Sequence, residues 1–139
     1  MNSPEFLKKI CDLEEGHVKR VVEGLTEAEL DATPLTGMMS AREQLAHLCE
    51  CYVAFSKEAK GEKHDWGTFQ VQATDGPSLM AEWKELRDAA VEAAVSSEDP
   101  KMWVEAVSFI QNHDEYHVGQ LCAMRLQMQP DWNPYAIYE

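Results

Sequence analysis

Residues 99–128 read DPKMWVEAVSFIQNHDEYHVGQLCAMRLQM, and this stretch decides the fold class. Asp99 and Pro100 are residue types preferred at the N-cap and first position of a helix, and Pro130 follows the end of the pattern. We therefore expect one long amphipathic helix that ends near Met128. Its apolar residues recur at helical spacing: Met102, Ala106, Phe109, Ile110, Leu121, Met124 and Met128.

Three other segments show the same periodicity, at about residues 3–25, 40–59 and 77–95, and a capping box predicts a short helix after Thr26. Alternating β-branched stretches, which are typical of strands, are absent. Residues 61–76 form the longest connection, and a connection of that length lets the next helix run parallel to the previous one. We expect an all-α four-helix bundle that forms a single domain over residues 1–139. The tail at 131–135 is expected to be extended, with its aromatic side chains packed on the bundle.

The charge of the chain bears on its partners. The 139 residues include 12 Lys and Arg against 25 Asp and Glu, which gives a formal net charge of -13. This charge repels phosphate backbones and anionic lipids, and no apolar run approaches the roughly 18 residues of a membrane span. We expect no nucleic-acid or membrane partner and, because the N-terminus lacks the layout of a signal peptide, a cytoplasmic location. The four cysteines are expected to be free thiols or metal ligands.

Two histidines interrupt the apolar face of the last helix. His113 and His117 are four residues apart, so their side chains lie one above the other and can reach a single point in the core. The neighbouring Asp114 and Glu115 are expected to project away from this face. Buried imidazoles need partners, and the partner here is either a metal ion or ordinary hydrogen bonds.

The second helix offers a third imidazole. His47 lies at the edge of its apolar face, next to Leu48. Three neutral imidazoles with one open position form the arrangement of catalytic zinc, although nickel, iron and manganese accept the same ligands. The sequence thus predicts a divalent metal site made of His47, His113 and His117.

Four nearby residues have alternative interpretations. Cys51 follows His47 by one turn, so it is either a fourth ligand that closes the site around a structural metal or a small buried thiol. Glu50 is either a general base or hydrogen-bond acceptor beside the ligands, or a solvated charge. His17 is interpreted as a core histidine held by hydrogen bonds, with a place in the pocket as the alternative. His64, in the long connection, is expected to be exposed.

Three segments together resemble a known family. LTEAEL at 25–30, SAREQLAHL at 40–48 and HDEYHVGQL at 113–121 are similar to the pattern of the DinB-like (YfiT-like) four-helix bundle proteins. The resemblance implies an up-down-down-up bundle, commonly a homodimer. It also implies a metal triad of one histidine on the second helix and two on the fourth, which here are His47, His113 and His117.

The same resemblance implies a class of reaction. Known activities in that family include transferases and an isomerase that depend on bacillithiol, mycothiol or glutathione. The leading hypothesis is therefore a metal-dependent transferase acting on a small molecule through a low-molecular-weight thiol as co-substrate. One alternative is a metal-dependent hydrolase in which the open position holds an activated water. The other is a module that binds a metal or small ligand without turnover.

Overall fold

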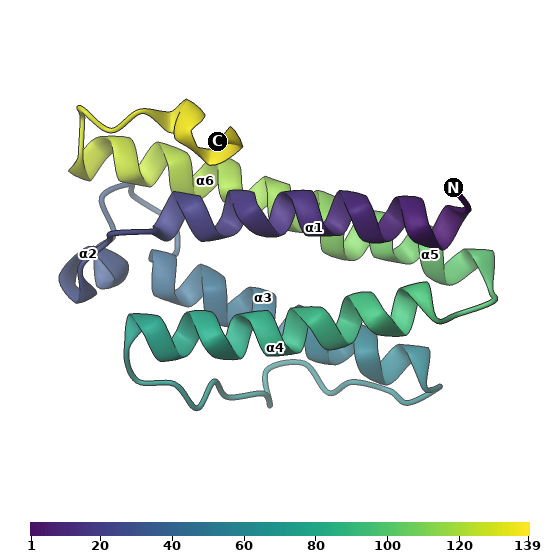
Figure 1. Cartoon of the computed structure of the whole chain (residues 1–139). Coiled ribbons are helices and arrows are strands. Elements are labelled where there is room, and N and C mark those ends of the chain that lie inside the picture. The colour runs from purple at the N-terminus through teal and green to yellow at the C-terminus, as the bar shows by residue number, and fades with distance from the viewer.

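The protein is a bundle of long helices. A computed structural model describes all 139 residues, and every regular element in it is helical. Three long helices and one composite rod lie alongside one another (Figure 1). The helices are α1 (Ser3–Val22), α3 (Ala41–Ala59) and α4 (Gly76–Val95), and the rod consists of α5 (Pro100–Ala106), the π turn η1 (Val107–Gln111) and α6 (Asn112–Met128). The minor elements are α2 (Glu27–Asp31) and the 3-10 helix η2 (Pro134–Tyr138).

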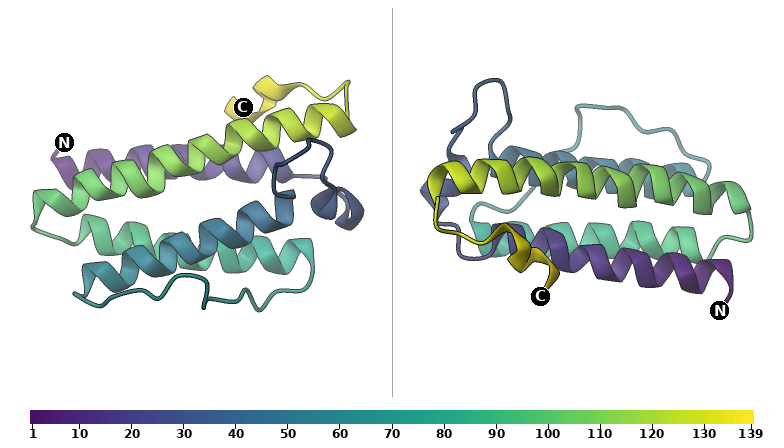
Figure 2. Two further views of the ribbon diagram at one scale, coloured as in Figure 1. Left: turned by 180° about the vertical axis from the view of Figure 1, so that it is seen from behind. Right: turned by 90° about the horizontal axis from the view of Figure 1, so that it is seen from above.

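The chain direction follows the predicted up-down-down-up order. In Figures 1 and 2, α3 runs antiparallel to α1, and α4 runs parallel to α3. The parallel pair results from the connection at 60–75, which passes back along the whole length of the bundle (Figure 1). The α5–η1–α6 rod then returns in the direction of α1 (Figure 2). None of the helices combines the length and apolarity needed to cross a bilayer.

Side-chain caps fix where the helices begin. Both predicted capping boxes are confirmed: Thr26 with Glu29 begins α2, and Ser40 with Glu43 begins α3. In the second box the Glu43 N–H donates to Ser40 Oγ at 3.1 Å, and the Ser40 N–H donates to Glu43 Oε2 at 2.9 Å. Such a cap contributes about 1 kcal/mol. The cap thereby fixes the first turn of α3, and His47 lies on the next turn.

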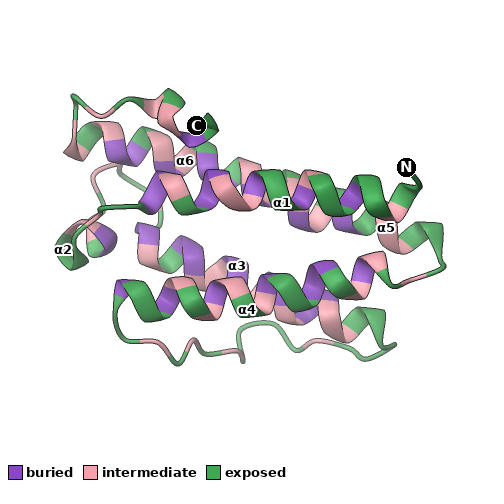
Figure 3. Cartoon of the chain, in the orientation of Figure 1, coloured by how far each residue is buried: buried purple, intermediate pink, exposed green.

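The core lies where the inner faces of the four helical segments meet (Figure 3). Trp83 of α4 and Tyr52 of α3 are fully buried, and the indole N–H of Trp83 donates to the Tyr52 hydroxyl at 3.1 Å. All four cysteines are free thiols. The remaining large core side chains include Phe55, Leu45, Leu48, Leu79 and Ile110.

The tail departs from the expected extended conformation. After a turn, residues 134–138 form η2, because Pro134 is favourable at a helix start and the Asn133 side chain accepts the Tyr135 N–H. Trp132 lies under the Arg125 guanidinium, 4.6 Å from its ring centroid, and Ile137 is buried. The predicted packing of the tail aromatics is therefore confirmed for Trp132 but wrong for Tyr135, which is 73% exposed.

Candidate metal centre

A π turn precedes the first histidine of α6. The Asn112 N–H donates to the Val107 carbonyl, five residues back, where an α-helix would bond four residues back. The sequence predicts one uninterrupted α-helix here and does not anticipate this turn. Such turns are frequent at functional sites, because the extra residue changes which side chains face the core. His113 lies immediately after it.

The three predicted ligands come together. His113 Nε2 lies 3.3 Å from His47 Nε2 and 3.1 Å from His117 Nε2. One ligand atom from each residue falls within 4.8 Å of the other two. Two nitrogens on a tetrahedral zinc ion, at about 2.0–2.1 Å from it, are themselves about 3.3 Å apart. The spacing of these Nε2 atoms thus fits ligands that share one ion.

The environment keeps the imidazoles of α6 neutral. Burial, together with the charges of the neighbouring His113 and His47, lowers the pKa of His117 to about 4. Burial and His47 also lower the pKa of His113. A neutral imidazole with a free nitrogen lone pair is the form that binds a metal. The donor set therefore suits a divalent cation.

Gln44, which the sequence analysis did not single out, orients His117. The Gln44 side chain is fully buried, and its amide nitrogen donates to the Met39 carbonyl at 3.0 Å. Its Oε1 therefore faces His117 and accepts the Nδ1–H at 2.9 Å. The proton is thus held on Nδ1 of His117, and the lone pair of Nε2 points toward His113. The sequence does carry one signal for this role, because Gln44 is an uncharged polar residue within an apolar stripe, three positions before His47.

Loss of the Gln44 amide should weaken metal binding without dismantling the bundle. We expect Gln44→Met to lower metal affinity by about 10–100-fold, because His117 loses the acceptor that fixes its tautomer. Chelator competition measures the change. The matched control is Gln127→Met at an exposed position of α6, which should retain the parental affinity. Equal affinities of the two variants would contradict the role of Gln44.

Packing, rather than a hydrogen bond to Nδ1, holds the His113 ring. Its ring lies between Phe109 and Tyr116, with centroid distances of 5.9 and 6.4 Å and interplanar angles of 24° and 20°. Its Nδ1 is buried without a hydrogen-bond partner. The only polar contacts of this ring are therefore made by Nε2, which faces the other two histidines.

Cys51 lies beside the three histidines. Its Sγ is 3.7 Å from His47 Nε2, while the group of mutually close ligand atoms contains the three histidines alone. Burial raises the pKa of the Cys51 thiol to about 12. The structure therefore places a thiol next to His47, and its service as a fourth ligand remains a prediction.

Glu50 and His64 contact each other. His64 Nε2 lies 2.9 Å from Glu50 Oε1, which also accepts the Gly67 N–H at 2.7 Å. The expectation that His64 is exposed is wrong: its side chain is 4% exposed, because Glu50 holds it against α3. Burial raises the pKa of Glu50, but the hydrogen bonds from His64 and Gly67 outweigh this and lower it overall. The partners of Glu50 thus lie in the connection at 60–75, and its role as a base remains a prediction.

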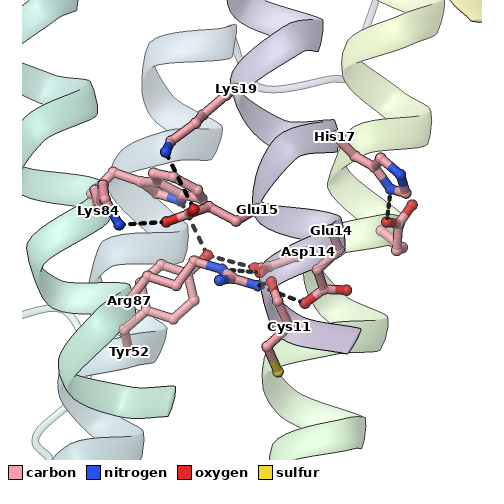
Figure 4. Close-up of polar contacts among 11 residues, drawn as sticks. Cys11, Glu14, Glu15, His17, Lys19, Tyr52, Lys84, Arg87 and Asp114 are labelled. Carbon is pink, nitrogen blue, oxygen red and sulfur yellow. Dashed lines mark hydrogen bonds and ion pairs between the residues drawn. The ribbon is translucent and has the colours of Figure 1, made fainter. Parts of the chain in front are cut away.

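His17 agrees with its interpretation as a core histidine. Its Nδ1 lies 2.5 Å from Glu115 Oε1, and its ring packs edge-on against Tyr138 at 5.0 Å. The pair joins α1 to α6 at the side of the bundle where the tail packs (Figure 4). Its partners are Glu115 and Tyr138, whereas the triad contacts Gln44 and Cys51.

Asp114 points into the core, so the expectation that it projects away is wrong. It is fully buried and accepts hydrogen bonds from Arg87 Nε at 2.9 Å and from the Tyr52 hydroxyl at 2.5 Å. Arg87 also donates to Glu14 Oε1 and to the Cys11 carbonyl, both at 2.8 Å (Figure 4). A carboxylate such as Asp114 can be buried here, because the positive charge of Arg87 on α4 compensates its negative charge within the core. The network ties all four helical segments together next to His113.

Glu14 gives this network a pH dependence. Burial and the charge of Asp114 raise the pKa of Glu14 from 4.5 to about 8, although Arg87 opposes the shift. Between these two pH values the unfolded chain has lost the Glu14 proton while the folded chain retains it. The free energy of unfolding contributed by Glu14 is therefore fully present below about pH 4.5 and is lost as the pH rises through about 8.

Glu14→Gln should remove this dependence. The variant keeps an oxygen to accept from Arg87, so we expect it to lose less stability than the parent between pH 5 and pH 8. Urea unfolding at several pH values measures the slopes. Glu15→Gln is the control, because salt bridges with Lys84 and Lys19 lower the pKa of Glu15 despite partial burial. Identical slopes in the parent and Glu14→Gln would contradict the assignment.

Comparisons with known proteins identify the family of the chain. A family model described as the DinB superfamily matches residues 14–121, a range that contains the three histidines and Gln44. No curated protein and no solved structure matches the chain. The match covers well over half of the 139 residues. The chain therefore belongs to the DinB superfamily.

Proposed function

We propose that the protein is a metal-dependent transferase that acts on a small molecule through a low-molecular-weight thiol. The observation that carries the proposal is the convergence of three imidazole nitrogens, from His47, His113 and His117, in a chain of the DinB superfamily. Three protein ligands leave one coordination position for a substrate. A bound divalent ion such as zinc, nickel, iron or manganese would supply the positive charge that lowers the pKa of a ligated thiol.

The chain's own residues supply binding and orientation. The three histidines would hold the ion, Gln44 fixes the tautomer of His117, and Phe109 and Tyr116 pack nearly parallel to the His113 ring. In the proposed transfer, the thiol sulfur forms a bond to an electrophilic carbon of the second substrate. The leaving group departs with the electron pair of the broken bond, and the thiol proton passes to solvent.

The proposal is tested in two steps. Elemental analysis of protein prepared without a metal-binding tag should find about one divalent ion per chain. The metal-loaded protein is then incubated with bacillithiol, mycothiol or glutathione and a panel of electrophiles. We expect thiol consumption that requires the ion and is lost in His117→Ala. Hydrolysis of esters or amides in the absence of any thiol would instead favour the metal-dependent hydrolase.

Cys51 separates a transferase from a binding module. We expect Cys51→Ala to retain about one metal ion per chain, because the three histidines suffice as ligands of an open site. Elemental analysis and the thiol assay measure the outcome, with Cys49→Ala, another buried thiol of α3, as the control. Loss of metal in Cys51→Ala alone would indicate a closed site, and with it a module without turnover.

We also propose that the protein is a cytoplasmic homodimer. Four unpaired thiols fit a reducing compartment. On one side of the bundle α1 exposes Phe6 and Leu13 at 57% and 67%, and the α5–η1–α6 rod exposes Val104 at 68%. Burial of such side chains against a second copy would be favourable. Light scattering should give twice the mass of the chain, and Phe6→Glu should give the monomer.

A further inference from the structure

A cavity of about 630 Å³ lies beside Phe109, whose ring stacks on that of His113. It lies between the end of α3, the first part of the connection at 60–75, and the start of the α5–η1–α6 rod. Phe109 lines it and also stacks on the ring of His113, so one aromatic side chain separates the cavity from the triad. The residues that line it include Glu58, Glu62, Lys63, Trp66, Glu105 and Phe109.

Two aromatic rings form a corner of this cavity. The rings of Trp66 and Phe109 are 6.2 Å apart and nearly perpendicular, at 80°. His64, held by Glu50, packs edge-on against Trp66 at 4.9 Å and so positions the indole. Trp66 is nevertheless 55% exposed, so part of its ring remains accessible from solvent. Aromatic faces that meet at a corner are the arrangement that attracts organic cations.

The charged side chains around the cavity are mostly negative, which is complementary to an organic cation. Glu58, Glu62 and Glu105 line it, and none of them takes part in an ion pair. Lys63 is the only Lys or Arg among the lining residues, and His64, which also lines the cavity, contacts Glu50. Three free carboxylates against one ammonium group produce a negative potential next to the aromatic corner. The net charge of -13 on the whole chain acts in the same direction.

We propose that this cavity binds an organic cation, and that the substrate class of the enzyme is small molecules bearing an ammonium group. The ammonium group would lie against Trp66 and Phe109, with Glu58 and Glu105 neutralising its charge. One part of the inference rests on the proposed function: the rest of the substrate would extend past Phe109 toward His113, where the reaction would take place. Binding of the cation itself requires neither metal nor turnover.

The test compares a cation with its uncharged isostere. Choline and 3,3-dimethylbutan-1-ol have the same shape and differ in the charge of the quaternary centre. Isothermal titration of the metal-free protein should give about tenfold tighter binding of choline than of the alcohol. The double variant Glu58→Gln/Glu105→Gln and the single variant Trp66→Leu should each reduce this preference to about twofold or less.

A matched control separates the cavity from the overall charge. Glu85→Gln/Asp131→Asn removes two carboxylates at exposed positions outside the cavity, and it should retain the full preference for choline. Equal binding of the two probes, or equal losses in the two double variants, would overturn the inference. Choline binding that survives in His47→Ala while metal is lost would show that the cavity and the metal site act independently. A protein that binds metal but not choline would refute the cation site and leave the proposed function standing.

Discussion

His113→Ala is expected to lose its metal ion. The variant removes the nitrogen that contacts both His47 and His117, so two ligands on different helices remain without the one between them. We expect metal affinity to fall by at least about 100-fold, since each ligand of such a site contributes several kcal/mol. Elemental analysis after dialysis against a weak chelator should then find less than about a tenth of an ion per chain.

The control is a histidine that the structure keeps apart from the triad. His17→Gln disturbs the pair with Glu115 but no triad nitrogen, so it should retain its metal. Both variants should keep the helical circular dichroism of the parent, because neither residue is needed for a helix cap. A full complement of metal in folded His113→Ala would refute the site.

Arg87→Met is expected to produce the largest loss of stability in the molecule. Arg87 is 1% exposed, and it is the cation that compensates Asp114, which has no exposed surface. Its removal leaves a buried carboxylate without a compensating cation, with only the Tyr52 hydroxyl as a hydrogen-bond donor, which costs about 3–5 kcal/mol. Urea unfolding at pH 7 measures the change.

Lys84→Met is the matched control for this prediction. Lys84 lies one turn earlier on α4 and pairs with Glu15 and Asp88, but its side chain is 44% exposed. Exposed pairs contribute at most about 1 kcal/mol, so the control should unfold close to the parent. A second test combines Arg87→Met with Asp114→Asn and Glu14→Gln, which removes both carboxyl groups that contact Arg87. Recovery of part of the lost stability is expected, and equal losses in Arg87→Met and Lys84→Met would contradict the network.

Local signals in the sequence predicted much of the fold and of the site. The capping boxes at Thr26 and Ser40 act within four residues, so their chemistry is visible in the sequence. The pair His113 and His117 depends only on helical spacing. The parallel arrangement of α3 and α4 follows from the length of a single connection. These features need no knowledge of distant contacts.

The features that were missed depend on partners far away in the chain. The buried position of Asp114 requires Arg87, 27 residues earlier, and that of His64 requires Glu50 to turn toward the connection. Gln44 acquires its role only when α6 packs against α3, 73 residues later. A charged or polar residue is expected to be solvated unless a compensating partner is known, and the sequence alone does not identify that partner.

The π turn η1 determines where this helix can change in length. It holds one residue more than an α-helical turn, so α5 and α6 follow helical registers that differ by about 100°. Deletion of Ser108, which faces solvent, would convert the turn into α-helix and rotate α5, while His113, Asp114 and His117 kept their places. We therefore expect insertions and deletions among related sequences to be more frequent at this turn than elsewhere in the helix. There they would rotate α5 and leave the ligands on α6 in place.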